Sequence, residues 1–314
     1  MKWLVTGAGG FLGSAVGEAI VAQGHEVIGL DRHAEKSASW PGEYVRSDLG
    51  SPESTAEILR SAAPDVVAHF AGTASVGESF TAPFADFEGS TALWFRLLEA
   101  VRLSGLHPQI ALASSAAVYG SPEQLPTPES APRNPESPYG FHKLLSEHVG
   151  EEFAACFGFS IMSLRFFSVF GPRQRRLLVW EIFDQLRRGA TVLRLKGTGD
   201  ERRDFLHVDE AAAAVVSACS APRAGFQAIN IASGTSVSVR EMAEMLRECA
   251  GSAAQIEFGR EILRGNPPHW QADVSLLQNL APAWSPQPLA KSLANCAAAW
   301  NGAEAGGRIA AGTP

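Results

Sequence analysis

Near the N-terminus the chain reads Thr6-Gly7-Ala8-Gly9-Gly10-Phe11-Leu12-Gly13, directly after a short apolar run at residues 2–6. A helix-like segment at residues 14–23 follows, and then a second apolar run at residues 26–30 that ends at Asp31. This order of strand, glycine turn, helix, strand and acid is typical of a dinucleotide-binding unit. The glycines let the backbone approach a pyrophosphate at the helix N-terminus, where unpaired N–H groups and the dipole favour anions. The alternative is a glycine-rich turn without a ligand.

Asp31 lies where a carboxylate would accept hydrogen bonds from the adenosine ribose of a dinucleotide. A carboxylate at this place repels a 2′-phosphate, and the sequence therefore favours NAD over NADP as the cofactor. Arg32 follows directly and would suit a 2′-phosphate, so NADP remains the alternative.

The same alternation continues through the first half of the chain. Apolar strands are expected at residues 44–46, 65–72, 110–113 and 160–166, and helices at 53–62, 84–103 and 139–157. This pattern predicts an α/β fold with a Rossmann-type, doubly wound parallel sheet, whose ligand crevice lies at the carboxyl ends of the strands. We therefore predict an NAD-binding domain at residues 1–170.

From residue 171 onward helices and loops dominate, with helices expected at 177–188, 209–220 and 239–250. This half predicts a smaller, mostly helical C-terminal substrate lobe at residues 171–301. Segments around 205–235 are expected to return to the large domain. Residues 302–314 are small and polar, and we expect them to be a disordered tail.

A second motif reads Ser137-Pro138-Tyr139-Gly140-Phe141-His142-Lys143. It predicts the start of a helix, because serine is a good N-cap and proline suits the first helical position. Tyr139 and Lys143 would then be stacked on one face of its first turns. The ammonium group and the positive helix end both favour phenolate, which makes the tyrosine a base near neutral pH. The alternative is an ordinary surface helix, since this spacing is common by chance.

The composition gives little support for several other classes of function. The chain has 314 residues and a formal net charge of −7, whereas a nucleic-acid partner normally needs a basic face. The four cysteines are scattered without metal-binding spacing, as is typical of reduced thiols in a cytoplasmic protein. No apolar run reaches the length of a membrane span, so no membrane partner is expected. The sequence has no Walker phosphate loop, HExxH or GxSxG motif; no metal site is expected, and His69 and His142 are interpreted as structural or surface residues.

Several motifs in one order resemble the extended short-chain dehydrogenase/reductase family, in particular its NAD-dependent nucleotide-sugar epimerase/dehydratase type. They are TGAGGFLG at residues 6–13, HFAG at 69–72, SSAAVYG at 114–120 and YGFHK at 139–143. The run HFAGTASVGES at 69–79 is similar to UDP-galactose 4-epimerases, and the likeness extends to GTGDERRDFLHV at 197–208. The resemblance covers most of the chain and implies NAD as cofactor, a nucleotide-diphosphate sugar as substrate and a role in carbohydrate biosynthesis.

The resemblance also implies the roles of individual residues. Tyr139 and Lys143 would be the catalytic pair, Lys143 would also bind the nicotinamide ribose, and Ser115 would hydrogen-bond the substrate hydroxyl. The NAD contacts would be Gly7, Gly10, Phe11, Leu12, Gly13, Asp31, Arg32, Asp48, Leu49, Phe70, Ala71, Gly72, Tyr139, Lys143 and Phe167. The substrate contacts would be Ser75, Ser115, Ser168, Arg203 and Arg264, of which Arg203 matches a diphosphate-binding arginine and Arg264 is a weaker match to a second. Ser90 and Ser168 stand where the family usually has Asn, which leaves substrate placement there open.

The segment before Tyr119 separates the reactions within this family. Dehydratases usually carry an Asp-Glu pair there to eliminate water, and decarboxylases carry a Glu, whereas this chain has Ala116-Ala117. Methyl groups cannot transfer protons, so hydride transfer alone remains: oxidation of carbon 4, rotation of the 4-keto sugar and return of the hydride to its other face. That reaction defines a nucleotide-sugar 4-epimerase. The alternatives are a nucleotide-4-keto-sugar reductase and a non-catalytic NAD-binding protein of the same fold.

The resemblance further implies a homodimer. In the family, helices that correspond to residues 84–103 and 139–157 pair across a two-fold axis as a four-helix interface.

Overall fold

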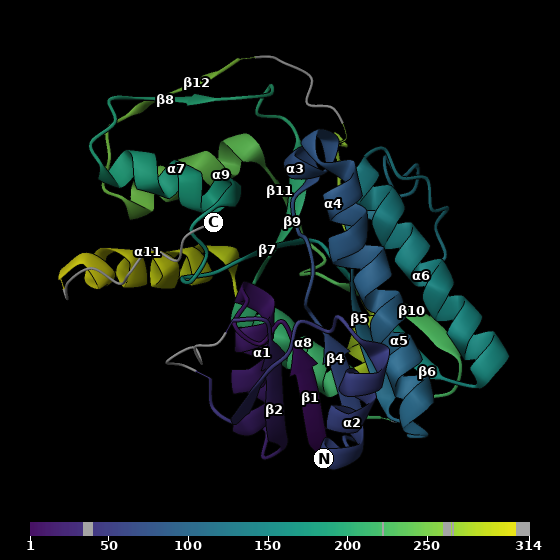
Figure 1. Ribbon diagram of the computed structural model, residues 1–314. Coiled ribbons are helices and arrows are strands. Elements are labelled where there is room, and N and C mark those ends of the chain that lie inside the picture. The colour runs from purple at the N-terminus through teal and green to yellow at the C-terminus, as the bar shows by residue number, and fades with distance from the viewer. Residues whose placement is uncertain (34–39, 222, 260–264, 266, 306–314) are drawn as a thin grey trace.

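The computed structural model describes residues 1–33, 40–221, 223–259, 265 and 267–305 (Figure 1). Its large sheet has seven parallel strands in the order β10-β6-β5-β4-β1-β2-β3. These strands are β1 (Lys2–Thr6), β2 (Glu26–Asp31), β3 (Glu43–Arg46), β4 (Val66–His69), β5 (Gln109–Ser115), β6 (Ser160–Phe166) and β10 (Phe226–Ile231). The predicted α/β fold with a Rossmann-type parallel sheet is confirmed.

Helices cover both faces of this sheet (Figure 1). One face carries α1 (Phe11–Ala22) and α8 (Val208–Cys219), and the other carries α2 (Pro52–Ala62), α5 (Leu93–Ser104) and α6 (Pro138–Phe157). Side chains along β1 alternate between the two cores, with Trp3 and Val5 in the first and Leu4 in the second. Because both faces are buried, the strands read as nearly continuous apolar runs.

Segments from the second half of the chain complete the large domain. β10 pairs with β6 at one edge of the sheet, and α8 packs against α1. A short helix, α10 (Ser275–Leu280), packs against α8 and β10. The carboxyl ends of the strands are therefore built from both halves of the chain.

The other C-terminal elements form a smaller lobe above the sheet (Figure 1). Three helices, α7 (Leu177–Arg187), α9 (Val239–Cys249) and α11 (Leu289–Ala305), share a core that includes Phe183 and Trp300. The lobe also contains a three-stranded sheet of β7 (Ser168–Phe170), β9 (Arg202–His207) and β11 (Ser236–Ser238), and a pair of β8 (Val192–Leu195) with β12 (Gln255–Phe258). These strands were not predicted, because runs this short do not show the period of a strand.

Two predicted segments differ from the structure. The helix expected at residues 84–103 is divided into α4 (Pro83–Phe87), a π-helical turn at Glu88–Ala92 and α5, and a short helix, α3 (Val76–Thr81), precedes it. Apolar spacing does not distinguish a π-helical turn from an α-helix, which explains the single predicted helix. Helix α11 extends to Ala305, so residues 302–305, which we predicted to be disordered, are helical; residues 306–314 lie outside the described residues. Within the described ranges, no helix has the length and hydropathy that a membrane span requires.

A buried ion pair fastens α6 to the sheet. Glu147 on α6 is fully buried, and its carboxylate accepts two hydrogen bonds from Arg165 on β6, at 2.9 and 2.8 Å. Ser114 and Ser163 each donate to the same carboxylate at 2.8 Å. Burial alone would raise the pKa of Glu147, but these hydrogen bonds and the charge of Arg165 hold it below its usual value. The carboxylate is therefore ionised and ties α6 to both β5 and β6.

We predict that Glu147→Ala lowers the free energy of unfolding by about 3–5 kcal/mol, because it leaves the Arg165 guanidinium buried without its counter-charge. Denaturant unfolding at neutral pH measures this loss. The double variant Glu147→Leu/Arg165→Met should recover part of it, since neither charge is then buried alone.

The matched control is Glu99→Ala, which breaks the more exposed Glu99–Arg102 pair on α5. Exposed ion pairs contribute little to stability, so its effect should be much smaller. Equal losses in Glu147→Ala and Glu99→Ala would show that the buried pair does not hold α6.

Candidate active site

The glycine-rich turn joins β1 to α1 in a tight packing arrangement. Gly7 has φ +69°, and a Cβ on it would lie 2.6 Å from the backbone nitrogen of Ala71. A Cβ on Gly13 would lie 2.1 Å from the Gly7 carbonyl oxygen, so both positions exclude any side chain. Gly10 is the N-cap of α1, and no side chain caps this helix. The backbone N–H groups of its first turn are therefore left without a capping side chain, as at helix N-termini that bind phosphate groups.

Asp31 ends β2 directly beside this turn. Its carboxylate accepts hydrogen bonds from the backbone N–H groups of Gly9, at 2.9 Å, and His33, at 3.1 Å. Asp31 is buried, whereas Arg32 is exposed and its carbonyl oxygen accepts a hydrogen bond from Arg46. The structure thus places the carboxylate, rather than the Arg32 guanidinium, against the glycine turn.

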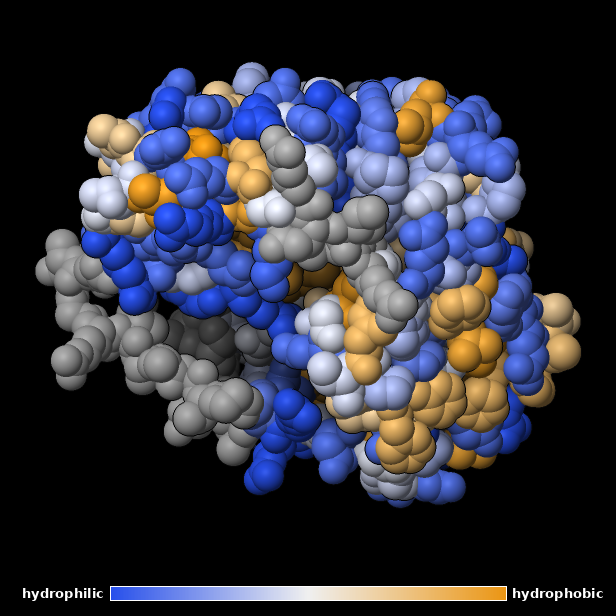
Figure 2. All heavy atoms as spheres, turned by 90° about the horizontal axis from the view of Figure 1, so that it is seen from above, coloured by the Kyte–Doolittle hydropathy of each residue, from blue (hydrophilic) through white to orange (hydrophobic). Residues whose placement is uncertain are grey.

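The other predicted cofactor residues follow the carboxyl ends of neighbouring strands. Asp48 and Leu49 follow β3, where Asp48 accepts a hydrogen bond from Gly50 and Leu49 is buried. Phe70, Ala71 and Gly72 follow β4, and Phe167 follows β6. Since parallel strands end at one edge of the sheet, these residues border the crevice above β1, β3, β4 and β6. Figure 2 shows the surface hollowed between the smaller lobe and the large domain.

The structure brings Ser115, Tyr139 and Lys143 together, as predicted. Helix α6 begins as expected, because the Ser137 side chain accepts a hydrogen bond from Gly140 N–H and Pro138 opens the first turn. The Lys143 ammonium lies 5.5 Å from the centre of the Tyr139 ring and donates to the Ala113 carbonyl at 2.9 Å. Ser115 ends β5, and its side chain forms a hydrogen bond with that of Tyr139.

The pKa of Tyr139 differs from the prediction. Burial raises the pKa of Tyr139 to about 12, although the Ser115 hydrogen bond and the charge of Arg176 act to lower it. Burial also lowers the pKa of Lys143 to about 8. The prediction that the lysine and the helix end give Tyr139 a low pKa is therefore wrong for the protein alone, because desolvation disfavours the charged form of both groups. A further positive charge beside the phenol is needed to favour phenolate.

The segment before Tyr119 carries no proton-transferring side chain. Ala116–Val118 forms a single 3-10 turn at the end of β5. The backbone N–H of Ala117 donates a hydrogen bond to the Ser115 hydroxyl at 3.1 Å. Ala116 and Ala117 are both buried. Ser115 is thus oriented by the backbone of a turn whose own side chains, Ala116, Ala117 and Val118, are all apolar.

Arg203 lies on β9 and is buried, with its guanidinium over the Trp270 ring at 5.1 Å from the ring centre. Burial lowers the pKa of Arg203 to about 10, so the side chain is charged at neutral pH. Trp270 donates to the Gly120 carbonyl at 2.8 Å and meets Phe167 edge to face. The tryptophan was not predicted as a site residue; the predicted site residue nearest to it in the sequence was Arg264.

The structure says less about the other predicted substrate residues. Ser75 caps α3 and accepts a hydrogen bond from Glu78 N–H, and Ser168 is half-buried at the start of β7. Arg264 lies outside the described residues. Its neighbour Gly265 packs tightly, since a Cβ there would lie 2.9 Å from Ser137 Cβ at the start of α6.

His69 is structural, because it is buried and hydrogen-bonded to Thr6 Oγ1 at 2.7 Å. Burial lowers its pKa to about 3, so the ring is neutral. In the described part of the chain, no three His, Cys, Asp or Glu side chains come together as metal ligands.

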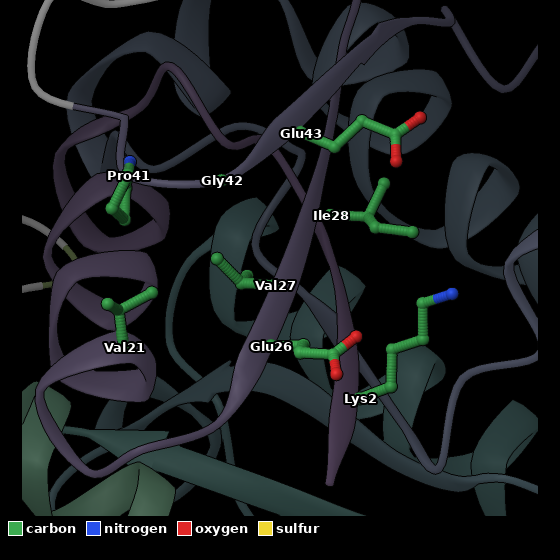
Figure 3. Close-up of a pocket in the computed structure, with 8 residues that line it drawn as sticks. All are labelled: Lys2, Val21, Glu26, Val27, Ile28, Pro41, Gly42 and Glu43. Atoms are coloured by element: carbon green, nitrogen blue, oxygen red, sulfur yellow. The ribbon is translucent and has the colours of Figure 1, made fainter.

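A cavity of about 330 Å³ lies elsewhere, beside the first residues of β1 and β2 (Figure 3). Lys2, Glu26 and Glu43 line it together with apolar residues. It is at the amino ends of the strands, opposite to the glycine turn and Tyr139, and so is separate from the candidate active site.

Comparison with known proteins agrees with this geometry. The model of the NAD-dependent epimerase/dehydratase family matches residues 3–232. The chain is similar to the UDP-glucose 4-epimerase of Mycolicibacterium smegmatis, with 30% identity over 90% of this chain and 96% of that protein. It is also similar to the solved Thermus thermophilus UDP-glucose 4-epimerase in complex with NAD, with 29% identity, a TM-score of 0.85 and coverage of 96% and 100% of the two chains. The Thermotoga maritima UDP-glucose 4-epimerase with UDP-glucose has 25% identity, a TM-score of 0.87 and coverage of 97% and 100%.

We predict that Lys143→Met raises the unfolding midpoint at pH 7. The folded state depresses the lysine pKa from 10.5 to about 8, so below about pH 8 the wild type carries the full cost of a buried ammonium. As the pH rises from about 8 toward 10.5, that cost is relieved in the wild type, and the gain of the variant should shrink.

Thermal unfolding at a series of pH values measures both effects. Lys291→Met, which replaces an exposed lysine on α11, should show no such pH-dependent gain. A Lys143→Met variant less stable than the wild type at pH 7 would contradict the prediction.

Proposed function

The chain belongs to the NAD-dependent epimerase/dehydratase family, and from this membership we propose that it is a nucleotide-sugar 4-epimerase. The observation that carries the proposal is the cluster of Ser115, Tyr139 and Lys143 beside two buried alanines. The named relatives are UDP-glucose 4-epimerases, which supports a UDP-hexose as the substrate.

The residues at the strand ends fit NAD. Gly7 and Gly13 leave a cradle that a side chain would fill, and the uncapped start of α1 suits the pyrophosphate. Asp31 offers its carboxylate to the adenosine ribose. When bound, NAD supplies the chemistry of accepting a hydride from carbon 4 of the sugar and returning it.

Tyr139 is the proton-transferring group in this proposal. Its hydroxyl oxygen, as phenolate, takes the proton of the carbon-4 hydroxyl during oxidation and returns it after reduction. Ser115 hydrogen-bonds Tyr139 and would also hold the substrate hydroxyl, which fixes the reacting atoms relative to each other. Lys143 stabilises the phenolate by its charge, and the positive charge of oxidised NAD would act in the same direction.

Arg203 would hold the diphosphate. A buried guanidinium forms strong, directional hydrogen bonds with phosphate oxygens, and the Trp270 ring supports it from one side. With the diphosphate held, the 4-keto sugar can turn its other face to the cofactor without leaving the site.

Elimination reactions are not supported by this site. A dehydratase or decarboxylase needs a proton-transferring side chain beside the sugar, and the turn next to Ser115 presents Ala116 and Ala117. The geometry therefore favours epimerisation over loss of water or carbon dioxide.

We predict that the enzyme inverts carbon 4 of a nucleotide sugar without added NADH. The test incubates it with UDP-, GDP- and CDP-sugars, with UDP-glucose among the first, and follows the stereochemistry at carbon 4 by NMR. Tyr139→Phe should lower the rate by about 10²–10⁴-fold, because it removes the acid–base oxygen but keeps the ring. NAD binding and stability should survive.

Tyr119→Phe is the matched control, since it also removes one phenolic oxygen but from a buried network with Arg165 and Asn230. It should retain most of the rate. Conversion that requires a 4-keto sugar and stoichiometric NADH would favour the reductase instead. No turnover with NAD bound would favour a binding protein.

The exposed face of α4, α5 and α6 supports the expected homodimer. Large apolar side chains that lie exposed on it are Phe84, Phe87, Phe95, Phe141 and Leu145. Phe84 is 71% exposed and Phe141 53%, which is unusual for side chains of this size. Figure 2 shows orange atoms gathered on the side of the molecule where these helices lie in Figure 1. A second copy that packs α4–α5 and α6 against the same helices would bury both faces.

We predict that the wild type has the mass of two chains in light scattering and that Phe141→Glu/Leu145→Glu is monomeric. Both residues lie on one face of α6, so two carboxylates there would be buried at the interface. Val21→Glu, which changes an exposed apolar residue on α1, should remain dimeric. A monomeric wild type at micromolar concentration would refute this interface.

A further inference from the structure

A fully buried carboxylate on β9 directly follows the arginine that we propose binds the diphosphate. Asp204, next to Arg203, has no exposed surface, and it was not predicted as a site residue. Its Oδ1 accepts hydrogen bonds from the Ser233 backbone N–H, at 2.8 Å, and from the Ser233 hydroxyl, at 2.6 Å. Its Oδ2 accepts hydrogen bonds from the backbone N–H groups of Gly234, at 3.0 Å, and Ala272, at 3.2 Å.

These hydrogen bonds join three segments that are far apart in the sequence. Asp204 belongs to the smaller lobe, whereas Ser233 and Gly234 follow β10, the edge strand of the large sheet. Ala272 belongs to a third segment, residues 268–273. Burial raises the pKa of Asp204 to about 6, although its hydrogen bonds act to lower it, so the side chain is mostly ionised at neutral pH. One carboxylate therefore ties the smaller lobe to the end of β10 and to segment 268–273.

Segment 268–273 holds the Arg203 side chain. Two backbone hydrogen bonds place the segment beside β9: Arg202 N–H donates to the Pro268 carbonyl at 2.9 Å, and Trp270 N–H donates to the Arg202 carbonyl at 3.1 Å. The Arg203 guanidinium lies over the Trp270 ring and also donates to the Pro268 carbonyl at 3.5 Å. The position of the guanidinium therefore depends on where this segment lies.

The Asp204 carboxylate anchors this segment through the Ala272 N–H, two residues after Trp270. Each of its two oxygens accepts two hydrogen bonds, and none of the four donors can act as an acceptor in exchange without turning away. An amide of the same size has only one acceptor oxygen. Its NH2 group would face either the two Ser233 donors or the N–H groups of Gly234 and Ala272. Asparagine would thus fit the space but lose part of the anchor.

Other contacts limit how far the segment can move. The Gln271 carbonyl accepts a hydrogen bond from Thr127 N–H at 2.7 Å, and Asp273 N–H donates to the Thr127 carbonyl at 2.9 Å. Loss of the Asp204 anchor should therefore shift the segment without detaching it. A shift is enough to weaken the hydrogen bonds between Arg203 and a phosphate, because such bonds depend on angle as well as distance.

We propose that Asp204 is a positioning residue for the substrate diphosphate: it anchors segment 268–273, which holds the Arg203 guanidinium where it binds phosphate oxygens. Asp204 does not touch the substrate and acts through Arg203. This role rests on the proposed function, in which Arg203 binds the diphosphate, but not on which reaction takes place at carbon 4.

Isothermal titration calorimetry of the full-length protein with NAD bound tests this role, with UDP, GDP and CDP as probes. The nucleotide that the wild type binds most tightly is then titrated into each variant. Asp204→Asn should raise its Kd by about 10-fold, the scale of one charged hydrogen bond that is lost or misaligned. The affinity for NAD should not change. A purely structural role would instead lower the stoichiometry of binding and leave the Kd of the folded molecules unchanged.

Asp200→Asn is the matched control, because it removes a carboxylate that is 83% exposed in the same lobe. It should leave the Kd unchanged. Arg203→Ala should raise the Kd at least as much as Asp204→Asn does. In the Arg203→Ala background, Asp204→Asn should add little, because the aspartate acts through the arginine. A wild-type Kd in folded Asp204→Asn, or full additivity of the two changes, overturns the proposal.

If Asp204→Asn does not fold, Ser233→Ala provides the second variant. It removes the hydroxyl that donates to Oδ1 and loosens the carboxylate. The Kd should then rise by about 3-fold, the scale of one neutral hydrogen bond. An unchanged Kd in Ser233→Ala would in that case overturn the proposal.

The titrations also separate this role from the proposed function. A wild type that binds none of the three nucleotides refutes the diphosphate site and the role of Asp204 with it. A raised Kd in Asp204→Asn of a protein that inverts no nucleotide sugar supports the role of Asp204 and refutes the epimerase. Inversion at carbon 4 with an unchanged Kd supports the epimerase and refutes this role. Where turnover is present, Asp204→Asn should raise KM and largely keep kcat, and a lower kcat at unchanged KM refutes it.

Discussion

The buried carboxylate of Glu147 sets the position of helix α6, and the candidate active site depends on that position. Arg165 and Ser163 hold it to β6, and Ser114 holds it to β5, one residue before Ser115. Tyr139, Lys143 and Glu147 follow one another at intervals of four residues, so they share one face of the helix. One ion pair therefore fixes the helix face from which Tyr139 and Lys143 approach the serine at the end of β5.

The same burial that positions these groups also works against their ionisation. Desolvation raises the pKa of Tyr139 and lowers that of Lys143, so it favours the neutral form of both groups. Positive charge from a bound cofactor would favour the phenolate form of Tyr139. The site is thus a buried pair whose useful protonation state depends on neighbours from other segments.

The smaller lobe completes the site from the other side. Arg203 on β9 stacks on Trp270, Trp270 is fastened to Gly120, and Gly265 packs against the start of α6. These contacts place the buried Arg203, which we propose binds the diphosphate, in the lobe that faces the strand ends. The turn next to Ser115 adds only the apolar side chains of Ala116, Ala117 and Val118, which is why we propose a reaction without elimination.

We could predict the glycine turn and the Tyr139–Lys143 spacing from the sequence, because each involves residues only a few positions apart. Asp31 could be predicted because it ends the second apolar run of the chain. The order of strands and helices could also be predicted, because apolar periodicity is a local pattern. That order was enough to predict the parallel sheet. The direction of the Tyr139 pKa, the contact between Asp86 and His142 and the stacking of Trp270 on Arg203 were not readable. Asp86 and His142 are 56 residues apart, and desolvation depends on everything packed around a group, so these features exist only once the chain has folded.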